Sequence, residues 1–341
     1  MAQYNIDWNG TSTFVREKVI PKIKDQFFKK NAMMFRLRNR AEILSGGKFI
    51  RQPLSFAPEG GGGQWWAGTD KFDTRLRQPF DSATYFFKNF EVPVIISQDE
   101  EDEVSGPEAW TSLVEAKMKL ANRTIMDSLG GSLGIFNDGS NPKAMTGFQF
   151  SLQDAITSQY GGIPQAGGVN TWWNHQVDAT AYTTGSGGNF IHNTNAMVLD
   201  IMLARQSLAA GRHCTMALCN WGVFNDASGL VNSKTTWFRP QQNQELAKHG
   251  FTNFQYRDVV FIVDEGVPRN SSTKVEKMYY IDEEALHLWI HAKRNFSNSD
   301  FRDAYDQAAR AMYIWFRGEM GFDERRTSGV QSAITTTLTS P

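Results

Sequence analysis

The 341-residue sequence has few cysteines, no long apolar run and almost no net charge. Its two cysteines, Cys214 and Cys219, are too few for a disulfide framework, and their spacing fits no common zinc site. We expect both to be buried as small apolar residues, in a chain kept in a reducing, aqueous compartment. No apolar run approaches the roughly 20 residues needed to cross a bilayer, and the first ten residues lack the pattern of a secretory signal, so no membrane partner is expected.

The small net charge conceals an uneven distribution along the chain. A formal charge of −1 argues against a dedicated nucleic-acid binder, which usually carries a basic face. Residues 1–51 hold eleven Lys and Arg against four Asp and Glu, a net charge of +7, which leaves −8 for the remainder. A basic arm on an acidic body would attract another copy of that body, and we expect Arg36, Arg38 and Arg40 to contact a neighbouring copy.

The basic arm has a helical pattern over residues 13–40, although Pro21 breaks or kinks it. Within it, the alternation of arginines in "RLRNR", residues 36–40, favours an extended segment over a helix. A solvated face and a docking arm both remain open for this run of charge.

Two strand-like segments flank an unusually long excursion. Ile50, Leu54 and Phe56 fall on one side of the first, and Pro53 marks it as an edge strand or a bulged one. The second is expected to place five apolar residues on one face: Phe86, Phe90, Val92, Val94 and Ile96. Residues 57–82 lie between the two, whereas an ordinary hairpin loop has about 2–5 residues.

The excursion combines flexibility with large apolar side chains. It contains four consecutive glycines, and its apolar side chains are Trp65, Trp66, Phe72 and Phe80. Such groups are costly to leave in water, so we expect a partner surface to cover them.

An acidic run, "DEEDE", follows the second strand. Its members are Asp99, Glu100, Glu101, Asp102 and Glu103. Adjacent carboxylates diverge and no calcium-loop spacing follows, so a metal site is disfavoured. A solvated face is the favoured interpretation, and a salt-bridging partner for a neighbouring basic arm is the alternative.

The strongest helix signal comes next. Ser105 and Glu108 form a capping box, and Pro107 lies in the first turn. Apolar residues then recur at steps of three and four as far as Leu129, and Gly130 with Gly131 ends the run. About 24 residues at 1.5 Å each give a rod of roughly 36 Å, which suits a structural spine.

The composition from residue 140 to about residue 274 is rich in Gly, Asn, Thr and Ser, which indicates a second domain. We expect a helix over 195–210, a buried strand over 214–221, a short helix over 221–227 and a last strand over 254–266. Residues 277–296 and 308–326 are expected to be aromatic strands, and the polar tail from Thr327 to be loose. The whole is therefore an α+β fold.

Several motifs resemble catalytic, metal-binding or phosphate-binding sites, but each has a structural explanation in this sequence. "GGSLG", with Ser132, matches a hydrolase nucleophile motif but follows a helix where a strand is required. His287 and His291 lack the glutamate of a zinc protease and are expected to be structural residues of a strand. "GGIPQAGG" lacks the ending of a phosphate loop. We therefore expect no enzyme, no catalytic residue, no cofactor and no metal.

The order of these features resembles the major capsid protein of tailed bacteriophages, which has the Hong Kong 97-type coat fold. "IFNDGSNPKAMTGFQFSLQDAITSQYGGI" resembles the family's exit from the spine helix, with Gly147-Phe148 in place of its "GL" pair. "YGGI…VNTWWNHQVD" resembles its "GGI…W" segment. "AARAMYIWFRGEMGFDERRTSGV" resembles its closing strand, with the basic pair Arg325-Arg326.

The resemblance implies four regions. They are an N-terminal arm (1–45), an extended loop (46–92), a peripheral domain on the spine helix (93–148 and 274–341) and an axial domain (149–273). It also implies self-assembly into pentamers and hexamers of an icosahedral head that encloses double-stranded DNA, which the inner face contacts non-specifically. Portal, scaffolding and decoration proteins would be further partners. The location would be the virion, after assembly in the host bacterial cytoplasm.

The same resemblance bears on individual residues. The extended loop would lie across the neighbouring subunit, and Trp172 and Trp173 would pack within or between subunits. Some relatives join the loop to a neighbour through a Lys–Asn isopeptide bond; Lys71 lies in the loop, but no acceptor is identified and the bond is not predicted. Two alternatives stay open. One is an encapsulin-like compartment that loads a cargo enzyme, and the other is a serine hydrolase using Ser132 or a glycan-binding module using the tryptophan pairs.

Overall fold

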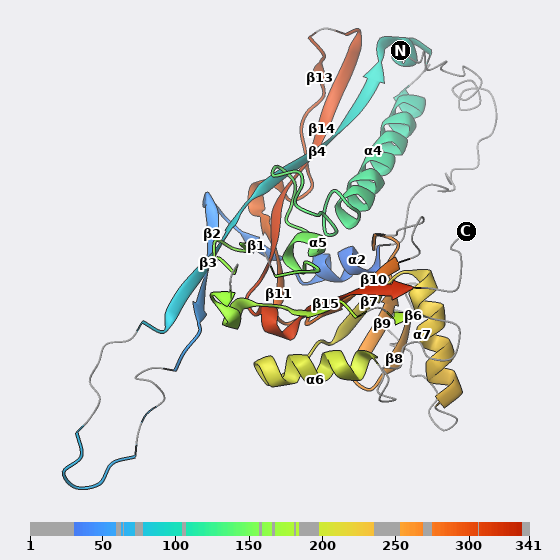
Figure 1. Cartoon of the computed structure of the whole chain (residues 1–341). Coiled ribbons are helices and arrows are strands. Elements are labelled where there is room, and N and C mark those ends of the chain that lie inside the picture. Colours follow the sequence, from blue (N-terminus) through green and yellow to red (C-terminus); the bar gives the residue numbers. More distant parts are fainter. Residues whose placement is uncertain are drawn as a thin grey trace.

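The computed structural model of the chain describes residues 31–58, 63, 65–71, 78–103, 107–156, 159–165, 168–180, 182–183, 198–234, 253–268, 275–305 and 307–335. Its helices are α2 (Ala32–Asn39), α3 (Gln98–Glu103), α4 (Pro107–Gly130), α5 (Phe148–Ser151), α6 (Val198–Ala210) and α7 (Trp221–Lys234), with 3₁₀ helices η3 (Thr171–Trp173), η4 (Ala292–Arg294) and η5 (Arg325–Thr327). Its strands are β1 (Glu42–Leu44), β2 (Phe49–Ser55), β3 (Phe80–Phe86), β4 (Lys88–Ser97), β5 (Gln176–Asp178), β6 (Tyr182–Thr183), β7 (Met216–Cys219), β8 (Asn253–Tyr256), β9 (Val259–Val263), β10 (Val275–Ile281), β11 (Leu286–His291), β12 (Ser297–Asn298), β13 (Arg302–Asp303), β14 (Ala309–Phe322) and β15 (Gly329–Thr335). The fold is α+β, as expected (Figure 1).

One sheet has seven strands in the order β5-β15-β10-β7-β9-β8, with β6 also paired to β15. Strand β7 shows why this sheet is buried on both faces. Its residues Ala217 and Cys219 face a core formed with α6 and α7, whereas Met216 and Leu218 face the larger core of the molecule. A continuous apolar run is the expected pattern for a strand covered on both sides.

The second sheet is built on β14, the longest strand. Its order is β1-β11-β14-β12, and β13 and β4 also pair with β14. Strands β4 and β14 run antiparallel from Ala309↔Ser97 to Gly318↔Lys88. Helix α4 packs against β4 (Figure 1), and its buried residues include Ala121, Ile125 and Leu129. The predicted spine helix is confirmed in position, length and Pro107 start; the capping residue Ser105 lies outside the described residues.

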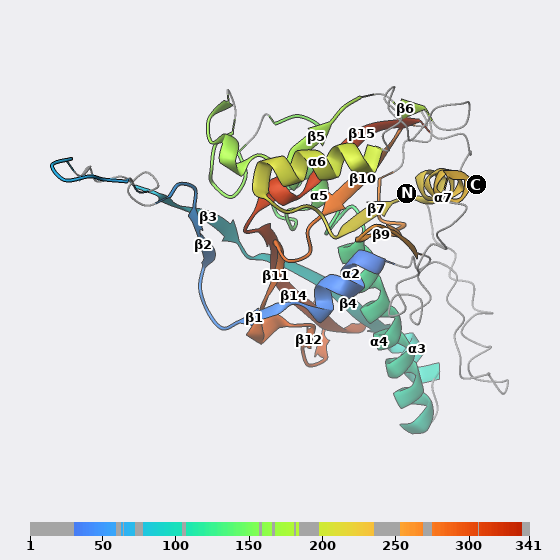
Figure 2. The same cartoon turned by 90° about the horizontal axis from the view of Figure 1, so that it is seen from below.

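The third sheet is a two-stranded hairpin of β2 and β3, paired from Phe49↔Phe86 to Ser55↔Phe80. It projects away from the two larger sheets and carries the long excursion beyond its far end (Figures 1 and 2). Pro53 lies in an edge strand with a regular register, which is the first of the two expected arrangements.

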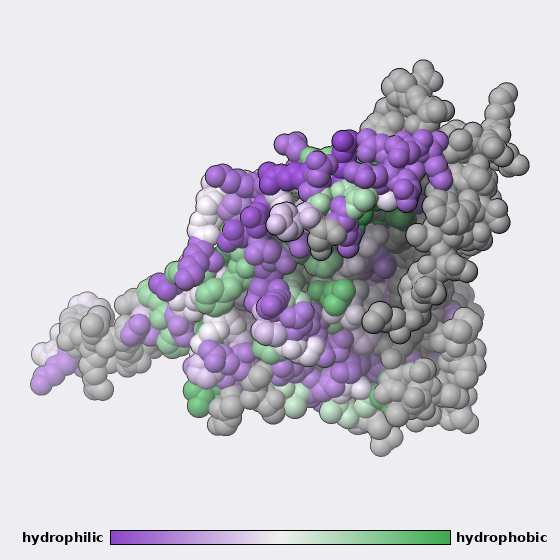
Figure 3. All heavy atoms as spheres, turned by 90° about the horizontal axis from the view of Figure 1, so that it is seen from above, coloured by the Kyte–Doolittle hydropathy of each residue, from purple (hydrophilic) through white to green (hydrophobic). Residues whose placement is uncertain are grey.

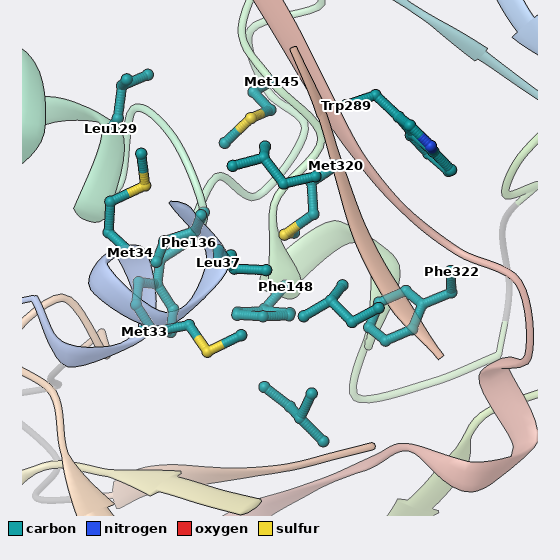
Figure 4. Packing of buried hydrophobic residues seen from close by; sticks show 14 of the residues in the cluster. Met33, Met34, Leu37, Leu129, Phe136, Met145, Phe148, Trp289, Met320 and Phe322 are labelled. Carbon is teal, nitrogen blue, oxygen red and sulfur yellow. The ribbon is translucent and has the colours of Figure 1, made fainter. Parts of the chain in front are cut away.

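The large core lies where α2, the end of α4, the segment after it and β14 meet (Figure 4). The segment after α4 packs so closely that a Cβ on Gly147 would lie 2.1 Å from the backbone nitrogen of Asn137. Its neighbour Phe148 is completely buried, with its ring 5.6 Å from that of Phe136. In the Gly147-Phe148 pair, the glycine therefore allows the close approach of the two segments and the phenylalanine fills the core beside it.

The structure corrects two expectations near the N-terminus. Arg36 and Arg38 lie in helix α2 and not in an extended segment, because Met33, Met34 and Leu37 bury one face of that helix. Phe86 is 54% exposed and does not share the buried face of Val94 and Ile96, because the alternation shifts at the buried Phe87 between β3 and β4.

Two further corrections concern later strands. The single strand expected over 254–266 is a hairpin of β8 and β9, which turns at Arg257 with a φ of 53°. The tail expected to be loose contains β15, which pairs with β10 and with β5 inside the seven-stranded sheet. No helix in the described part of the chain is long and apolar enough to span a membrane.

Candidate assembly surfaces

The outer face of the β2–β3 hairpin carries three exposed phenylalanines among polar side chains and lacks a covering layer among the described residues. The register places Phe49 opposite Phe86 on this face, with ring centroids 6.2 Å apart. Phe80, at its far end, is 62% exposed, and the Arg51 guanidinium lies 5.4 Å from the Phe49 ring. Figure 3 shows apolar residues among polar ones where the projection joins the body. A two-stranded sheet is only marginally stable alone, so its open face favours a protein partner.

The excursion beyond the hairpin carries the predicted tryptophans. Trp65 is fully exposed and Trp66 is 61% exposed. Lys71 is also exposed, whereas Phe72 lies outside the described residues. The two indoles are large apolar groups far from the core, in the arrangement expected of an anchor for another surface.

The base of the hairpin is fixed to the body by specific contacts. The Thr84 backbone N–H donates to the carbonyl oxygen of Gly161 at 2.7 Å, and the Tyr85 hydroxyl donates to the carbonyl oxygen of Phe322 at 2.6 Å. The ring of Phe56 stacks on Trp172 at 5.1 Å. The projection therefore leaves the body in a defined direction.

Trp173 packs within its own chain. It is 1% exposed, and its indole N–H donates to the carbonyl oxygen of Tyr160 at 3.1 Å. Gly161 and Gly162, with φ of 61° and 83°, form the tight turn that brings Tyr160 opposite Ile163. The first glycine doublet of "GGIPQAGG" thus shapes a turn that supports the hairpin.

Sequence reasoning missed the group that joins these segments, Arg325. It is 1% exposed, its guanidinium donates to the carbonyl oxygen of Ser151, and Nη2 donates to Nδ1 of His175 at 2.9 Å. Nε2 of His175 therefore carries the proton and donates to the Gln153 carbonyl oxygen at 2.7 Å. Burial and the neighbouring cation lower the pKa of His175 to about 3, so it is neutral, and burial lowers the pKa of Arg325 to about 10. The only signal in the sequence was a basic pair beside an aromatic strand.

The three predicted arginines of the arm are not equivalent. Arg36 forms an ion pair with Glu283 of the same chain at 2.6 Å. Arg38 is exposed and lies 5.0 Å from the centre of the Phe296 ring, and Arg40 is exposed. Arg38 and Arg40 are thus the two of the three whose side chains are exposed.

The acidic run forms helix α3, and it too divides into two groups. Lys117 binds Glu100 at 2.5 Å, and Arg310 binds Glu101 at 2.8 Å. The Lys117 hydrogen bond lowers the pKa of Glu100 against the opposing effect of partial burial. Asp99 is exposed, as are Asp102 and Glu103. These three carboxylates remain accessible to another chain.

The residues considered as catalytic or metal-binding candidates do not come together in one site among the described residues. Ser132 is exposed in the turn after α4, and its hydroxyl has no hydrogen bond to a histidine among the described residues. His287 contacts Glu42 at 2.8 Å and Asp323 at 3.3 Å, and these carboxylates raise its pKa. Burial raises the pKa of both cysteine thiols. The described residues contain no group of three metal-binding side chains.

Comparisons with known proteins are informative at the level of structure. No protein-family model and no curated protein matches the sequence. The structure is similar to the capsid asymmetric unit of cyanophage A-1(L), with a TM-score of 0.64 and 14% identity, covering 95% of this chain and 98% of the other. It is also similar to the SrpI encapsulin of Synechococcus elongatus PCC 7942, with a TM-score of 0.56, 10% identity and 97% coverage of each chain. The capsid of the Myoviridae phage XM1 gives a TM-score of 0.51 and 14% identity, covering 93% of this chain and 97% of the other.

These likenesses extend over almost the whole of each chain. The chain therefore has the Hong Kong 97-type coat fold that its sequence resembles. At 10–14% identity they establish the fold and leave the function to be argued from the surfaces.

Proposed function

We propose that this chain is the major capsid protein of a tailed bacteriophage, a structural subunit and not an enzyme. Copies of it assemble into an icosahedral head that encloses double-stranded DNA. The observation that carries the proposal is the projecting hairpin, whose outer face exposes Phe49, Phe80 and Phe86 although its base is held rigidly. Burying one such ring is worth about 1.5–3 kcal/mol, and a closed shell repeats the contact at every subunit.

The proposal includes a division of labour along the chain. The arm (1–45) and the extended loop (46–92) reach neighbouring subunits. The peripheral domain (93–148 and 274–341) forms the shell wall, and the axial domain (149–273) converges on the five-fold and six-fold axes. Portal, scaffolding and decoration proteins would complete the head, which assembles in the host bacterial cytoplasm.

The similarity to an encapsulin favours a second candidate with the same architecture. A shell of this fold could hold a cargo protein in place of DNA. The two differ in contents and not in the hairpin contact, so the fold alone does not separate them.

Electron microscopy of the expressed full-length protein tests the shell proposal. We expect closed icosahedral particles, whereas a monodisperse monomer of about 38.5 kDa at high concentration would refute it. Particles recovered from an infected or induced host then decide the contents. Nuclease-protected double-stranded DNA supports the phage head, and a stoichiometric co-purifying protein without DNA supports the compartment.

A further inference from the structure

The imidazole of His287 lies between two carboxylates that come from distant parts of the chain. Its Nδ1 is 2.8 Å from Oε1 of Glu42 in β1, and its Nε2 is 3.3 Å from Oδ2 of Asp323, which follows β14. These three residues belong to none of the assembly surfaces described above. The cluster therefore needs an explanation of its own.

The arrangement suits a protonated imidazole. A neutral imidazole has one N–H and donates to one carboxylate, whereas an imidazolium has two and donates to both. In the neutral form, the lone pair of a ring nitrogen would face a carboxylate oxygen. The hydrogen bonds to Asp323 and Glu42 raise the pKa of His287 above its ordinary value of 6.5, against the opposing effect of partial burial.

Glu42 receives a second donor from the same strand, β11. Nε1 of Trp289 donates to Oε2 of Glu42 at 3.0 Å, and the Trp289 ring stacks on that of His287 with centroids 5.6 Å apart. Each oxygen of Glu42 is thus bound by a side chain of β11. Only the His287 donor is lost by titration near neutral pH.

The other charged groups on the elements packed against β11 have contacts elsewhere. On α2, Arg36 forms an ion pair with Glu283, and Arg38 lies over the Phe296 ring. On the part of β14 that pairs with β11, Glu319 accepts a backbone N–H. The two carboxylates described above are therefore the charged groups that meet the His287 ring.

Strand β1 has few other contacts that hold it on the sheet. It is three residues long, lies at the edge of its sheet and, among the described strands, pairs with β11 alone. Ile43 is 61% exposed, and Leu44 is half-buried. The contacts of Glu42 are therefore a large share of the attachment of β1.

The position of β1 matters because the projecting hairpin begins just after it. Gly46 and Gly47, with φ of 82° and 86°, separate β1 from β2. A Cβ on Gly46 would meet nothing within 4 Å, so packing does not hold this joint. The attachment of β1 therefore sets where the first strand of the hairpin starts.

We propose that His287 is a pH-sensitive clamp that holds β1 against β11 and thereby fixes the entry to the hairpin. Below about pH 6.5 the imidazolium donates to both carboxylates, and the contribution of the clamp is complete. As the pH rises through the raised pKa of the folded state, one donor is lost and β1 opens more often. The inference concerns the folded chain and depends neither on assembly nor on the contents of a shell.

Hydrogen exchange of the full-length protein between pH 6 and pH 9, followed by mass spectrometry, tests the clamp. After correction for the intrinsic exchange rate, the protection of residues 42–45 relative to β10 is expected to fall about fivefold over this range. In His287→Gln it is expected to be low at every pH. His213→Gln is the control, because His213 contacts Asp258 in another part of the chain, and it is expected to keep the fall. A constant protection in the unaltered protein, or an equal fall in His287→Gln, would overturn the proposal.

Titration of the His287 imidazole by NMR gives a second measurement, which does not depend on a variant at His287. Glu42→Gln is expected to lower the midpoint of this titration by about 0.5 pH unit, because one of the two carboxylates is removed. Glu115→Gln, at an exposed site on α4, is expected to leave the midpoint unchanged. The same midpoint in Glu42→Gln and in the unaltered protein would show that the imidazole does not hold β1 and would overturn the proposal.

Discussion

The guanidinium carbon of Arg325 lies 4.3 Å from the centre of the Tyr160 ring, and no carboxylate pairs with this buried arginine among the described residues. Its negative partners are carbonyl oxygens and aromatic faces, including Trp173 at 5.9 Å. Arg325 begins η5, which connects β14 of one large sheet with β15 of the other. Because Tyr160 also begins the turn that holds the hairpin, this one cation ties both sheets to the base of the projection.

Replacing Arg325 by Met is expected to lower the free energy of unfolding by about 2–4 kcal/mol, because the buried acceptors at Ser151, Trp173 and His175 lose their donor. Arg326→Met is the matched control; Arg326 is next in the same 3₁₀ helix and is half-buried, with an expected effect within about 0.5 kcal/mol. Urea unfolding of the unassembled chains measures both. Equal midpoints for the two variants would show that the buried cation is not needed.

Glu319 is expected to make the stability depend on pH. It is 1% exposed, accepts the backbone N–H of Thr146 at 2.8 Å, and burial raises its pKa to about 7. The folded state binds this proton more tightly than the unfolded chain, whose pKa is near 4.5. Its contribution is therefore complete below about pH 4.5 and is lost as the pH rises through about 7.

The measurement is the melting temperature of Glu319→Gln and of the unaltered protein between pH 5 and pH 8. The variant is expected to lose less stability over this window, by an amount on the order of 2–3 kcal/mol. Asp264, whose pKa burial raises to about 6, titrates in both proteins and cancels in the comparison. Glu115→Gln, at an exposed site, is expected to follow the unaltered protein. Parallel curves for Glu319→Gln and the unaltered protein would contradict the assignment.

The sequence alone was enough to predict those elements whose pattern of apolar residues or glycines is complete within a short stretch of the chain. The apolar steps of α4, the continuous apolar run of β7 and the long hairpin excursion each have a signature within a short window. The exposure of Trp65 and Trp66 followed because glycine-rich chain cannot bury them.

The features that were missed depend on contacts distant in sequence. Strand β15 has a polar sequence, but β10 and β5 satisfy its backbone, and Gln331 meets the Tyr280 hydroxyl at 3.2 Å. The charged helix α2 forms because it packs on a core assembled from other segments. Phe49 and Phe86 were not recognised as one exposed pair, because the change of alternation at Phe87 is set by the body and not by the hairpin.

The outer face of the hairpin is expected to be required for assembly and not for folding. Phe49→Ser with Phe86→Ser removes two rings that the chain itself leaves 43% and 54% exposed. Because each ring is already about half buried, the loss is about half of the 1.5–3 kcal/mol of a full burial, or about 1.5–3 kcal/mol for the two rings together, which raises the concentration needed for particle formation at least tenfold. Leu208→Ser with Tyr305→Ser removes large side chains elsewhere that are more exposed still, at 89% and 106%, and is expected to leave assembly unchanged. Light scattering across a concentration series measures the threshold, and unchanged thresholds in both variants would exclude this face.

The three accessible carboxylates of α3 are expected to attract a basic segment of a neighbouring subunit. The test neutralises Asp99, Asp102 and Glu103 with amides and keeps Glu100 and Glu101, which hold Lys117 and Arg310 of the same chain. Exposed ion pairs contribute about 0.2–1 kcal/mol each, so assembly at 50 mM salt is expected to weaken by up to about 100-fold. The difference is expected to disappear at 500 mM salt because the charges are screened.

A second triple variant separates a specific contact from an effect of net charge. Amides at Glu91, Glu115 and Asp300, all of them exposed, remove the same total charge from other surfaces. If α3 meets a neighbour's arm, only the first triple variant shows the salt-dependent loss. Identical behaviour of the two would mean that the acidic body as a whole, and not α3, attracts the arm. That outcome would also remove Arg38 and Arg40 as specific partners of α3.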